Sequence, residues 1–142
     1  MKTFIPKEKD FDRKTYLLDA TGKTLGRLAT RVSSLLIGKH KTVFAQDQIS
    51  GDQVIVINAT KVHVTGNKIK QKVYNHFTGY RDGLRLYTYE ELMAKDPEEI
   101  IIRAVSRMLP NNKMGRKMLT RLRVYAGAEH QQKSQKPIAL DQ

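Results

Sequence analysis

Residues 15–38, TYLLDATGKTLGRLATRVSSLLIG, carry the clearest structural signal in the chain. The run from Thr15 to Ala20 is short and apolar, which predicts a buried strand. After a turn, apolar residues recur at steps of three and four, as on the buried side of a helix: Leu25, Leu28, Ala29, Val32, Leu35 and Leu36. Gly38 is expected to end this helix. The stretch therefore predicts a strand, a tight turn and an amphipathic helix.

The turn between this strand and helix shares the letters GKT with the phosphate-binding loop of nucleotide-hydrolysing enzymes. That loop needs a glycine five residues before the Gly-Lys pair, so that backbone N–H groups can wrap the phosphates, and Leu17 stands there. The apolar run 54–57 ends in Asn58, where a magnesium-holding carboxylate would be required. A nucleotide-dependent enzyme built on residues 17–24 is therefore only an alternative interpretation. The favoured one is that Gly22 serves the turn and Lys23 opens a basic helix face.

The charge of the chain indicates a polyanionic partner. Among 142 residues, 26 are Lys or Arg and 14 are Asp or Glu, which gives a net charge of +12. An anionic membrane surface is the weaker candidate, because no apolar run approaches the roughly 18 residues of a spanning helix. Pro6, Glu8 and Asp10 interrupt the region where a signal peptide needs apolar residues. We therefore expect no membrane partner, and a protein that stays in the compartment where it is made.

Metal and thiol chemistry are not expected. The chain has no cysteine, which removes disulfides, thiolate nucleophiles and cysteine-bound zinc. The four histidines lie far apart with no pair at helical spacing: His40, His63, His76 and His130. We predict no metal site, no cofactor and no catalytic residue, and each histidine is expected to face solvent or phosphate.

Further strands are predicted on both sides of the middle of the chain. The continuous apolar run in residues 51–59 fits a strand in the middle of a sheet that is covered on both faces. Residues 61–68 alternate around Val62 and Val64, as a strand does, and then enter a turn. Residues 123–127 predict a closing strand or an extended arm.

Three more helices are predicted. Thr88 with Glu91, and Asp96 with Glu99, have the spacing of capping boxes. Pro97 fits the first position of the second of these helices. Apolar residues from Met114 onward recur every four residues, which predicts a short helix with outward basic side chains.

The basic residues are expected to form the functional surface, in three groups. The first helix and the turn after it contribute Lys23, Arg27, Arg31, Lys39, His40 and Lys41. A predicted loop over residues 68–85 mixes cations with planar side chains that can stack on unpaired bases, namely Lys68, Lys70, Lys72, Tyr74, His76, Tyr80 and Arg85. Residues 100–128 contain no acid, and there we predict contacts from Arg107, Lys113, Arg116, Lys117, Arg121 and Arg123. For each group, a merely solvated basic face is the alternative.

Taken in order, these features resemble one family, the bacterial form of large-subunit ribosomal protein L-thirteen. The similar blocks are DATGKTLGRLAT, GKHK, GDQVIVINA, VTGNK, YNHFTGY and RMLPNNKMGRKMLTRLRVYAGAEH with QKP. They cover nearly the whole chain. The most specific block is 108–110, followed at the family's distances by Gly115-Arg116 and by residues 122–127.

The resemblance implies a three-layer α/β/α single domain around a small mixed, mostly parallel sheet, with an extended basic loop and polar termini. We expect residues 1–13 to be an extended leader, 14–127 the domain and 128–142 a polar tail that is either frayed or ordered by RNA. The implied function is that of a cytoplasmic structural constituent of the large ribosomal subunit, not an enzyme. Its implied partners are large-subunit ribosomal RNA, which it helps to assemble early, and neighbouring ribosomal proteins. The resemblance implies no small-molecule substrate. A free repressor that binds messenger RNA, including its own, is the alternative.

Overall fold

The computed structural model describes residues 6–140. The parts of the predicted leader and tail at 1–5 and 141–142 lie outside this range. The elements, in chain order, are η1 (Glu8–Asp10), β1 (Thr15–Asp19), α1 (Leu25–Ile37), β2 (Gln53–Ile57), η2 (Ala59–Lys61), α2 (Lys68–Gln71), β3 (Val73–Phe77), β4 (Leu84–Thr88), α3 (Tyr89–Lys95), α4 (Pro97–Ser106), α5 (Lys113–Leu119), β5 (Leu122–Val124), η3 (Lys133–Gln135) and β6 (Ile138–Ala139).

Four strands form a parallel sheet in the order β5-β2-β1-β6. In the register of the central pair, Leu18 lies beside Val56. Successive side chains of β2 point to opposite faces, yet Val54, Ile55 and Val56 are all buried. The prediction that residues 51–59 hold a central strand covered on both faces is confirmed.

Helix α1 has the buried side that the sequence predicts, and its six predicted apolar residues are all buried. Gly38 ends the helix in the left-handed conformation, with φ of 86°, where a side chain would be strained. The end of α1 also packs backbone to backbone against the segment that leads into β2. A Cβ on Gly51 would lie 1.7 Å from the carbonyl oxygen of Leu36. Glycine is therefore required at position 51 for the helix and the sheet to meet.

The predicted capping box is present at the start of α3, whereas α4 has only its predicted N-cap residue. Thr88 and Glu91 form the predicted capping box at the start of α3. The Asp96 side chain accepts a hydrogen bond from the backbone N–H of Glu99 and so caps α4. The Glu99 carboxylate does not complete a box there. It binds Arg103 instead, whose guanidinium lies 2.6 Å away in an ion pair one turn along the helix.

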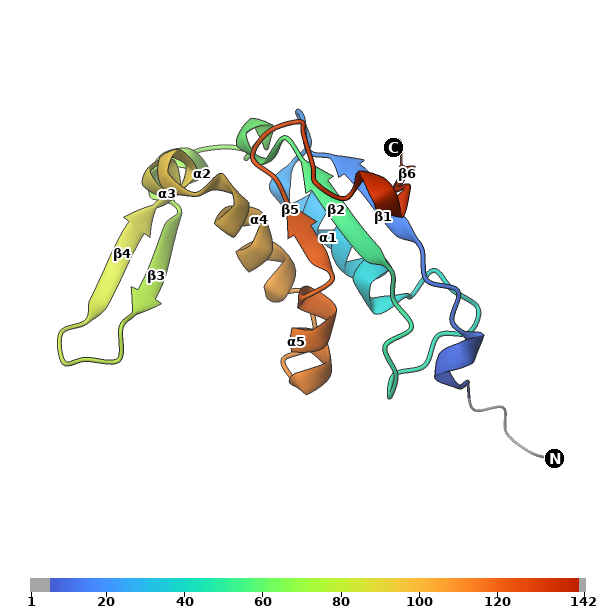
Figure 1. The fold of residues 1–142 in the computed structure, drawn as a ribbon. Coiled ribbons are helices and arrows are strands. Elements are labelled where there is room, and N and C mark those ends of the chain that lie inside the picture. The colour runs from blue at the N-terminus through green and yellow to red at the C-terminus, as the bar shows by residue number, and fades with distance from the viewer. Residues whose placement is uncertain (1–5, 141–142) are drawn as a thin grey trace.

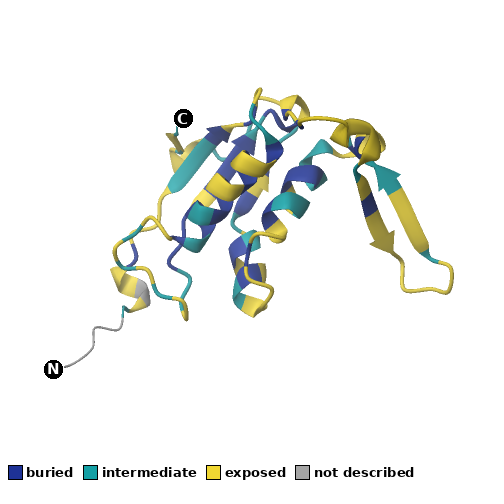
Figure 2. Cartoon of the chain, turned by 180° about the vertical axis from the view of Figure 1, so that it is seen from behind, coloured by how far each residue is buried: buried dark blue, intermediate teal, exposed yellow. Residues whose placement is uncertain are grey.

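The helices α1 and α4 pack on each other and on the same face of the sheet. Figure 1 shows α1 behind the strands and the C-terminal segment with η3 passing in front of them. Figure 2, seen from behind, shows that burial is concentrated where these helices meet the sheet. The predicted single α/β domain around a small, mostly parallel sheet is confirmed. The second cover of the sheet is the C-terminal segment with its short η3.

The predicted loop over residues 68–85 is instead a helical turn, α2, followed by an antiparallel hairpin of β3 and β4. Both faces of the hairpin carry aromatic or aliphatic residues, so the alternation that would have indicated strands is hidden. The hairpin projects from the body of the molecule (Figure 1) and is mostly exposed (Figure 2). The predicted basic loop is therefore regular secondary structure, a short helix followed by a β-hairpin.

One other segment differs from the sequence prediction. Residues 61–68 do not form a strand; their one ladder contact is the isolated bridge between Thr24 and His63. In the C-terminal segment, β6 pairs in parallel with β1, and Leu140 N–H donates to the Leu17 carbonyl at 3.0 Å. The described part of the predicted tail therefore includes a short strand that pairs with the edge of the sheet.

Candidate nucleic-acid interface

A basic groove opens where three elements meet: the N-terminal turn of α1, the segment leading into and through α2, and the end of α4. Its volume is about 730 Å³. Cations of all three groups predicted from the sequence converge there, and within residues 6–140 no acid lines it. The lining residues are Thr24, Leu25, Gly26, Arg27, Thr30, His63, Val64, Thr65, Lys68, Lys72, Ala104, Arg107 and Met108. The fold therefore brings Arg27, Lys68, Lys72 and Arg107 to one site.

The cations of the basic groove repel one another. Partial burial is the main reason that the pKa of Lys72 lies below its ordinary value, and the positive charges of Arg107 and Lys68 lower it further. No carboxylate within the described lining compensates these charges. A bound anion would relieve both the repulsion and the desolvation.

Replacing Arg107 with glutamine is expected to raise the pKa of Lys72, because one like charge is removed. The pKa should stay below the ordinary lysine value, since burial is its largest cause and remains. The measurement is a pH titration followed by NMR at the Lys72 side-chain carbon next to the ammonium group. Arg123→Gln on β5 is the control. An unchanged Lys72 pKa in Arg107→Gln would show that the two side chains are not close in solution.

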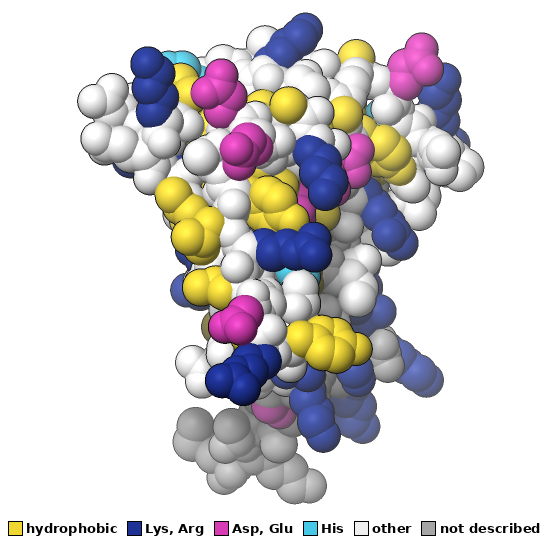
Figure 3. Space-filling model, turned by 90° about the vertical axis from the view of Figure 1, so that its left-hand side faces the viewer, with side chains coloured by type: hydrophobic (Ala, Val, Ile, Leu, Met, Phe, Trp, Pro, Cys, Tyr) yellow, Lys and Arg dark blue, Asp and Glu magenta, His cyan; other side chains and the backbone are white. Residues whose placement is uncertain are grey.

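A second exposed group lies on the hairpin. His76 on β3 pairs across the ladder with Arg85 on β4, and Tyr80 at the tip is 79% exposed. Phe77, which is not among the predicted site residues, is 64% exposed. Seen from the hairpin side, apolar side chains are interleaved with Lys and Arg, and several Asp and Glu side chains lie on the same face (Figure 3). This mixture suits contact with unpaired bases and phosphates together.

Tyr74 does not belong to that exposed group, contrary to the sequence prediction. It is 3% exposed and packs in the core at the base of the hairpin. Lys72 and Arg103 lie over its ring, at 5.5 and 5.7 Å from the centroid. Burial raises the pKa of its hydroxyl. Arg103 also donates to the backbone carbonyl of Asn75. Tyr74 thus fixes the hairpin to α4 and is not available for stacking on a base.

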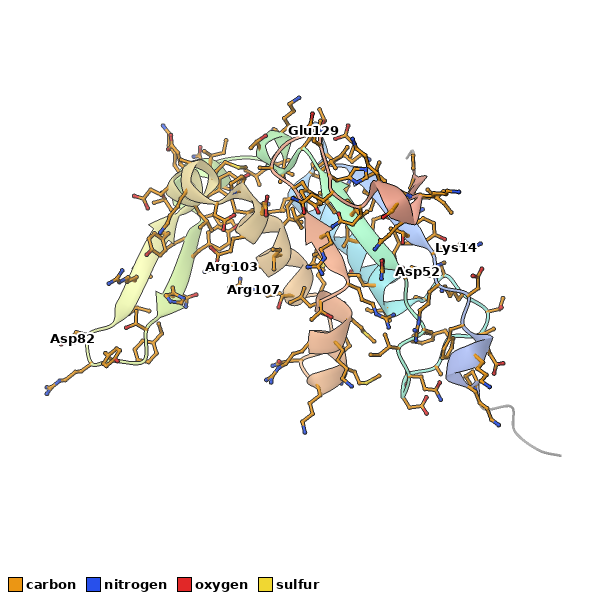
Figure 4. All side chains as sticks on the ribbon, viewed as in Figure 1. Lys14, Asp52, Asp82, Arg103, Arg107 and Glu129 are labelled. Carbon is orange, nitrogen blue, oxygen red and sulfur yellow. The ribbon has the colours of Figure 1, made fainter. Side chains whose placement is uncertain are left out.

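His40 and Lys41 are also engaged inside the protein. Both contact the fully buried carboxylate of Asp52, His40 Nε2 at 2.8 Å and Lys41 Nζ at 2.5 Å. The backbone N–H of Lys14 donates to the same carboxylate. Figure 4 shows Asp52 near Lys14, far from Arg103 and Arg107. The sequence predicts that His40 and Lys41 contact RNA. In the structure Lys41 instead pairs with a buried charge and also donates to the Asp12 carbonyl, so that it ties the leader to the start of β2.

Arg121 likewise turns inward and donates to the Gly51 carbonyl at 2.8 Å. Lys23 is half-buried beside the turn. The remaining predicted cations are exposed on α1, the turn after it, α2, α5 and β5, but they do not line the groove: Arg31, Lys39, Lys70, Lys113, Arg116, Lys117 and Arg123.

His63 lines the groove but is not among the predicted site residues. Nothing in its local sequence pattern indicates that the bridge to Thr24 brings it there.

The turn at residues 19–23 lacks the free amides of a phosphate-binding loop. Its N–H groups are taken within the fold: Thr21 donates to Asp19, Gly22 to the Lys61 carbonyl and Lys23 to the Ala20 carbonyl. Hydrogen bonds from Asn58 and from Thr21 lower the pKa of the Asp19 carboxyl. This anionic, internally bonded turn does not support the nucleotide-binding alternative.

Across residues 6–140, no helix is long and apolar enough to cross a membrane. The same residues hold no group of three or more His, Asp and Glu side chains placed to bind a metal ion.

Comparison with known proteins identifies the family. The pattern described as Ribosomal protein L13 matches residues 13–131. The chain belongs to the ribosomal protein L13 family. It is 51% identical to the large ribosomal subunit protein uL13 of Finegoldia magna (strain ATCC 29328 / DSM 20472 / WAL 2508), over 99% of both chains. It is also 51% identical to the uL13 of Thermotoga petrophila, over 99% of this chain and 94% of the relative.

The family match confirms the resemblance stated from the sequence. Ribosomal protein L13 is a family of structural ribosomal components, which confirms the prediction that the chain is not an enzyme. The match covers every lining residue of the basic groove and the whole hairpin, because both lie between residues 13 and 131.

Proposed function

We propose that the chain is a structural constituent of the large ribosomal subunit in the cytoplasm, which binds ribosomal RNA and supports early assembly of the subunit. The observation that carries the proposal is the basic groove: cations from α1, α2 and α4 converge there with no acid among the described lining residues, in a chain of the L13 family. Its neighbours on the subunit would be other ribosomal proteins.

The physical basis is phosphate neutralisation by a rigid array of cations. Binding releases the counterions condensed on RNA, so affinity falls steeply as salt rises. The buried core holds the groove, the hairpin and α5 in fixed relative positions, so their cations can meet several RNA elements at once. RNA shape would give most of the specificity, with His76 and Tyr80 as the candidates for contact with unpaired nucleotides.

The test is co-sedimentation of the tagged chain with ribosomal subunits from its own cells, followed by stepwise salt washes. We expect it to travel with the large subunit and to dissociate only as salt rises. The affinity of the isolated chain for RNA, with about 6 to 10 phosphate contacts, should fall by a thousandfold or more between 50 and 200 mM salt. A chain that stays at the top of the gradient would overturn the ribosomal proposal. Sequencing the RNA recovered with it would then test the alternative, a repressor of its own messenger RNA.

A further inference from the structure

The basic groove has an apolar interior that phosphate binding alone does not require. Leu25 and Val64 are buried in its wall, and Ala104 is half-buried beside them. Met108 is 41% exposed, although it lies among cations. The hydroxyl of Thr30 donates to the Met108 sulfur at 3.6 Å, which holds the side chain over α1. The groove therefore offers a fixed apolar surface inside a ring of positive charge.

The size of the groove fits one small ligand. About 730 Å³ is within the range of about 300 to 1,000 Å³ that is typical of small-molecule sites. An RNA duplex would not use the interior, because its bases are paired and stacked and none is free to enter a groove. An unpaired base, in contrast, has two exposed faces, and the ribose keeps its phosphate within a short distance of the base.

We propose that the basic groove receives a single unpaired nucleotide of the bound RNA, with the base against Met108, Ala104 and Val64 and the flanking phosphates at Lys68, Lys72 and Arg107. This inference rests on the proposed RNA-binding function and names the ligand of that site. His63, also in the lining, supplies a planar ring for the second face of the base. Thr24 makes no capping hydrogen bond to α1, so its hydroxyl is free to bind the edge of the base.

Gly26 allows a steric test that leaves every charge in place. It lines the groove on the first turn of α1, and an added Cβ would meet no atom within 4 Å. Gly26→Leu should place a side chain inside the groove, obstruct the base and lower the affinity for a short single-stranded RNA by about tenfold or more. Affinity for a perfect duplex of the same length should stay unchanged. Gly127→Leu is the matched control, because Gly127 also has open space around its Cβ and lies outside the groove.

A second measurement uses the unaltered full chain, labelled with ¹³C at the methionine methyl groups. Titration with the single-stranded RNA should move the Met108 methyl resonance upfield, through the ring current of the base, while that of Met93 stays in place. The duplex should leave Met108 unshifted. Assignment comes from Met108→Leu, and thermal melting checks that each variant is folded.

The outcomes separate this inference from the proposed function. An unshifted Met108 methyl under saturating single-stranded RNA, or full affinity in Gly26→Leu, would overturn nucleotide insertion while RNA binding by the chain stands. If the unaltered chain binds neither the single strand, the duplex nor large-subunit RNA, the proposed function itself is wrong.

Discussion

Gly51→Ala is expected to lower the free energy of unfolding by about 3 kcal/mol or more, at the upper end of the usual effects of overpacking. The added Cβ would lie 1.7 Å from the Leu36 carbonyl oxygen and 2.4 Å from the carbonyl carbon. These are backbone atoms in the last turn of α1, so no side chain can rotate away. The helix would have to move away from the segment that leads into β2. Asp52, the buried residue that follows Gly51, would then lose contacts with its partners.

Urea unfolding followed by circular dichroism measures this effect. Gly26→Ala is the control, because position 26 is helical and open. There the same change should stabilise the protein by about 0.5–1 kcal/mol, the helix propensity difference between the two residues. Equal stabilities of Gly51→Ala and the unaltered chain would show that α1 and β2 are farther apart in solution than in the structure.

Removing three groove cations is expected to have the largest effect on RNA binding. The variant with Lys68→Gln, Lys72→Gln and Arg107→Gln should bind large-subunit ribosomal RNA about 100-fold more weakly at 50 mM salt. The slope of log affinity against log salt should fall by about 3, since each lost phosphate contact removes close to one unit. At high salt the two proteins should converge, because the lost contribution is electrostatic.

Filter binding over a series of salt concentrations gives both quantities. The control variant replaces three exposed lysines outside the groove with glutamine, at positions Lys9, Lys133 and Lys136, and has the same net charge. It should keep most of the slope. If both variants lose affinity equally, binding depends on net charge alone, and the groove is not a specific site.

The regular elements were predictable because their signals are local. The apolar spacing of α1, the stop at Gly38 and the continuous run of β2 each depend on a few neighbouring residues, and all three appear in the structure. The hairpin was missed because Phe77 and Leu84 on one face, and Tyr74 and Tyr87 on the other, give no alternation of polar and apolar residues.

The candidate site was predictable only as a set of cations. Sequence spacing does not show which cation meets a distant acid, so Lys41 could not be separated from Lys72, although one binds buried Asp52 and the other lines the groove. His63 reaches the groove through a bridge to Thr24, 39 positions away in sequence, and no local pattern encodes such a contact.

The hairpin of β3 and β4 also affects how the free protein behaves in solution. Val73, Phe77, Leu84 and Leu86 are exposed on one of its faces, and within the described chain no third strand pairs with either of its edges. Open strand edges beside apolar side chains promote self-association. The net charge of +12 opposes it, because copies repel one another. Salt screens that repulsion. The ionic strength that releases the protein from RNA therefore also lowers its colloidal stability.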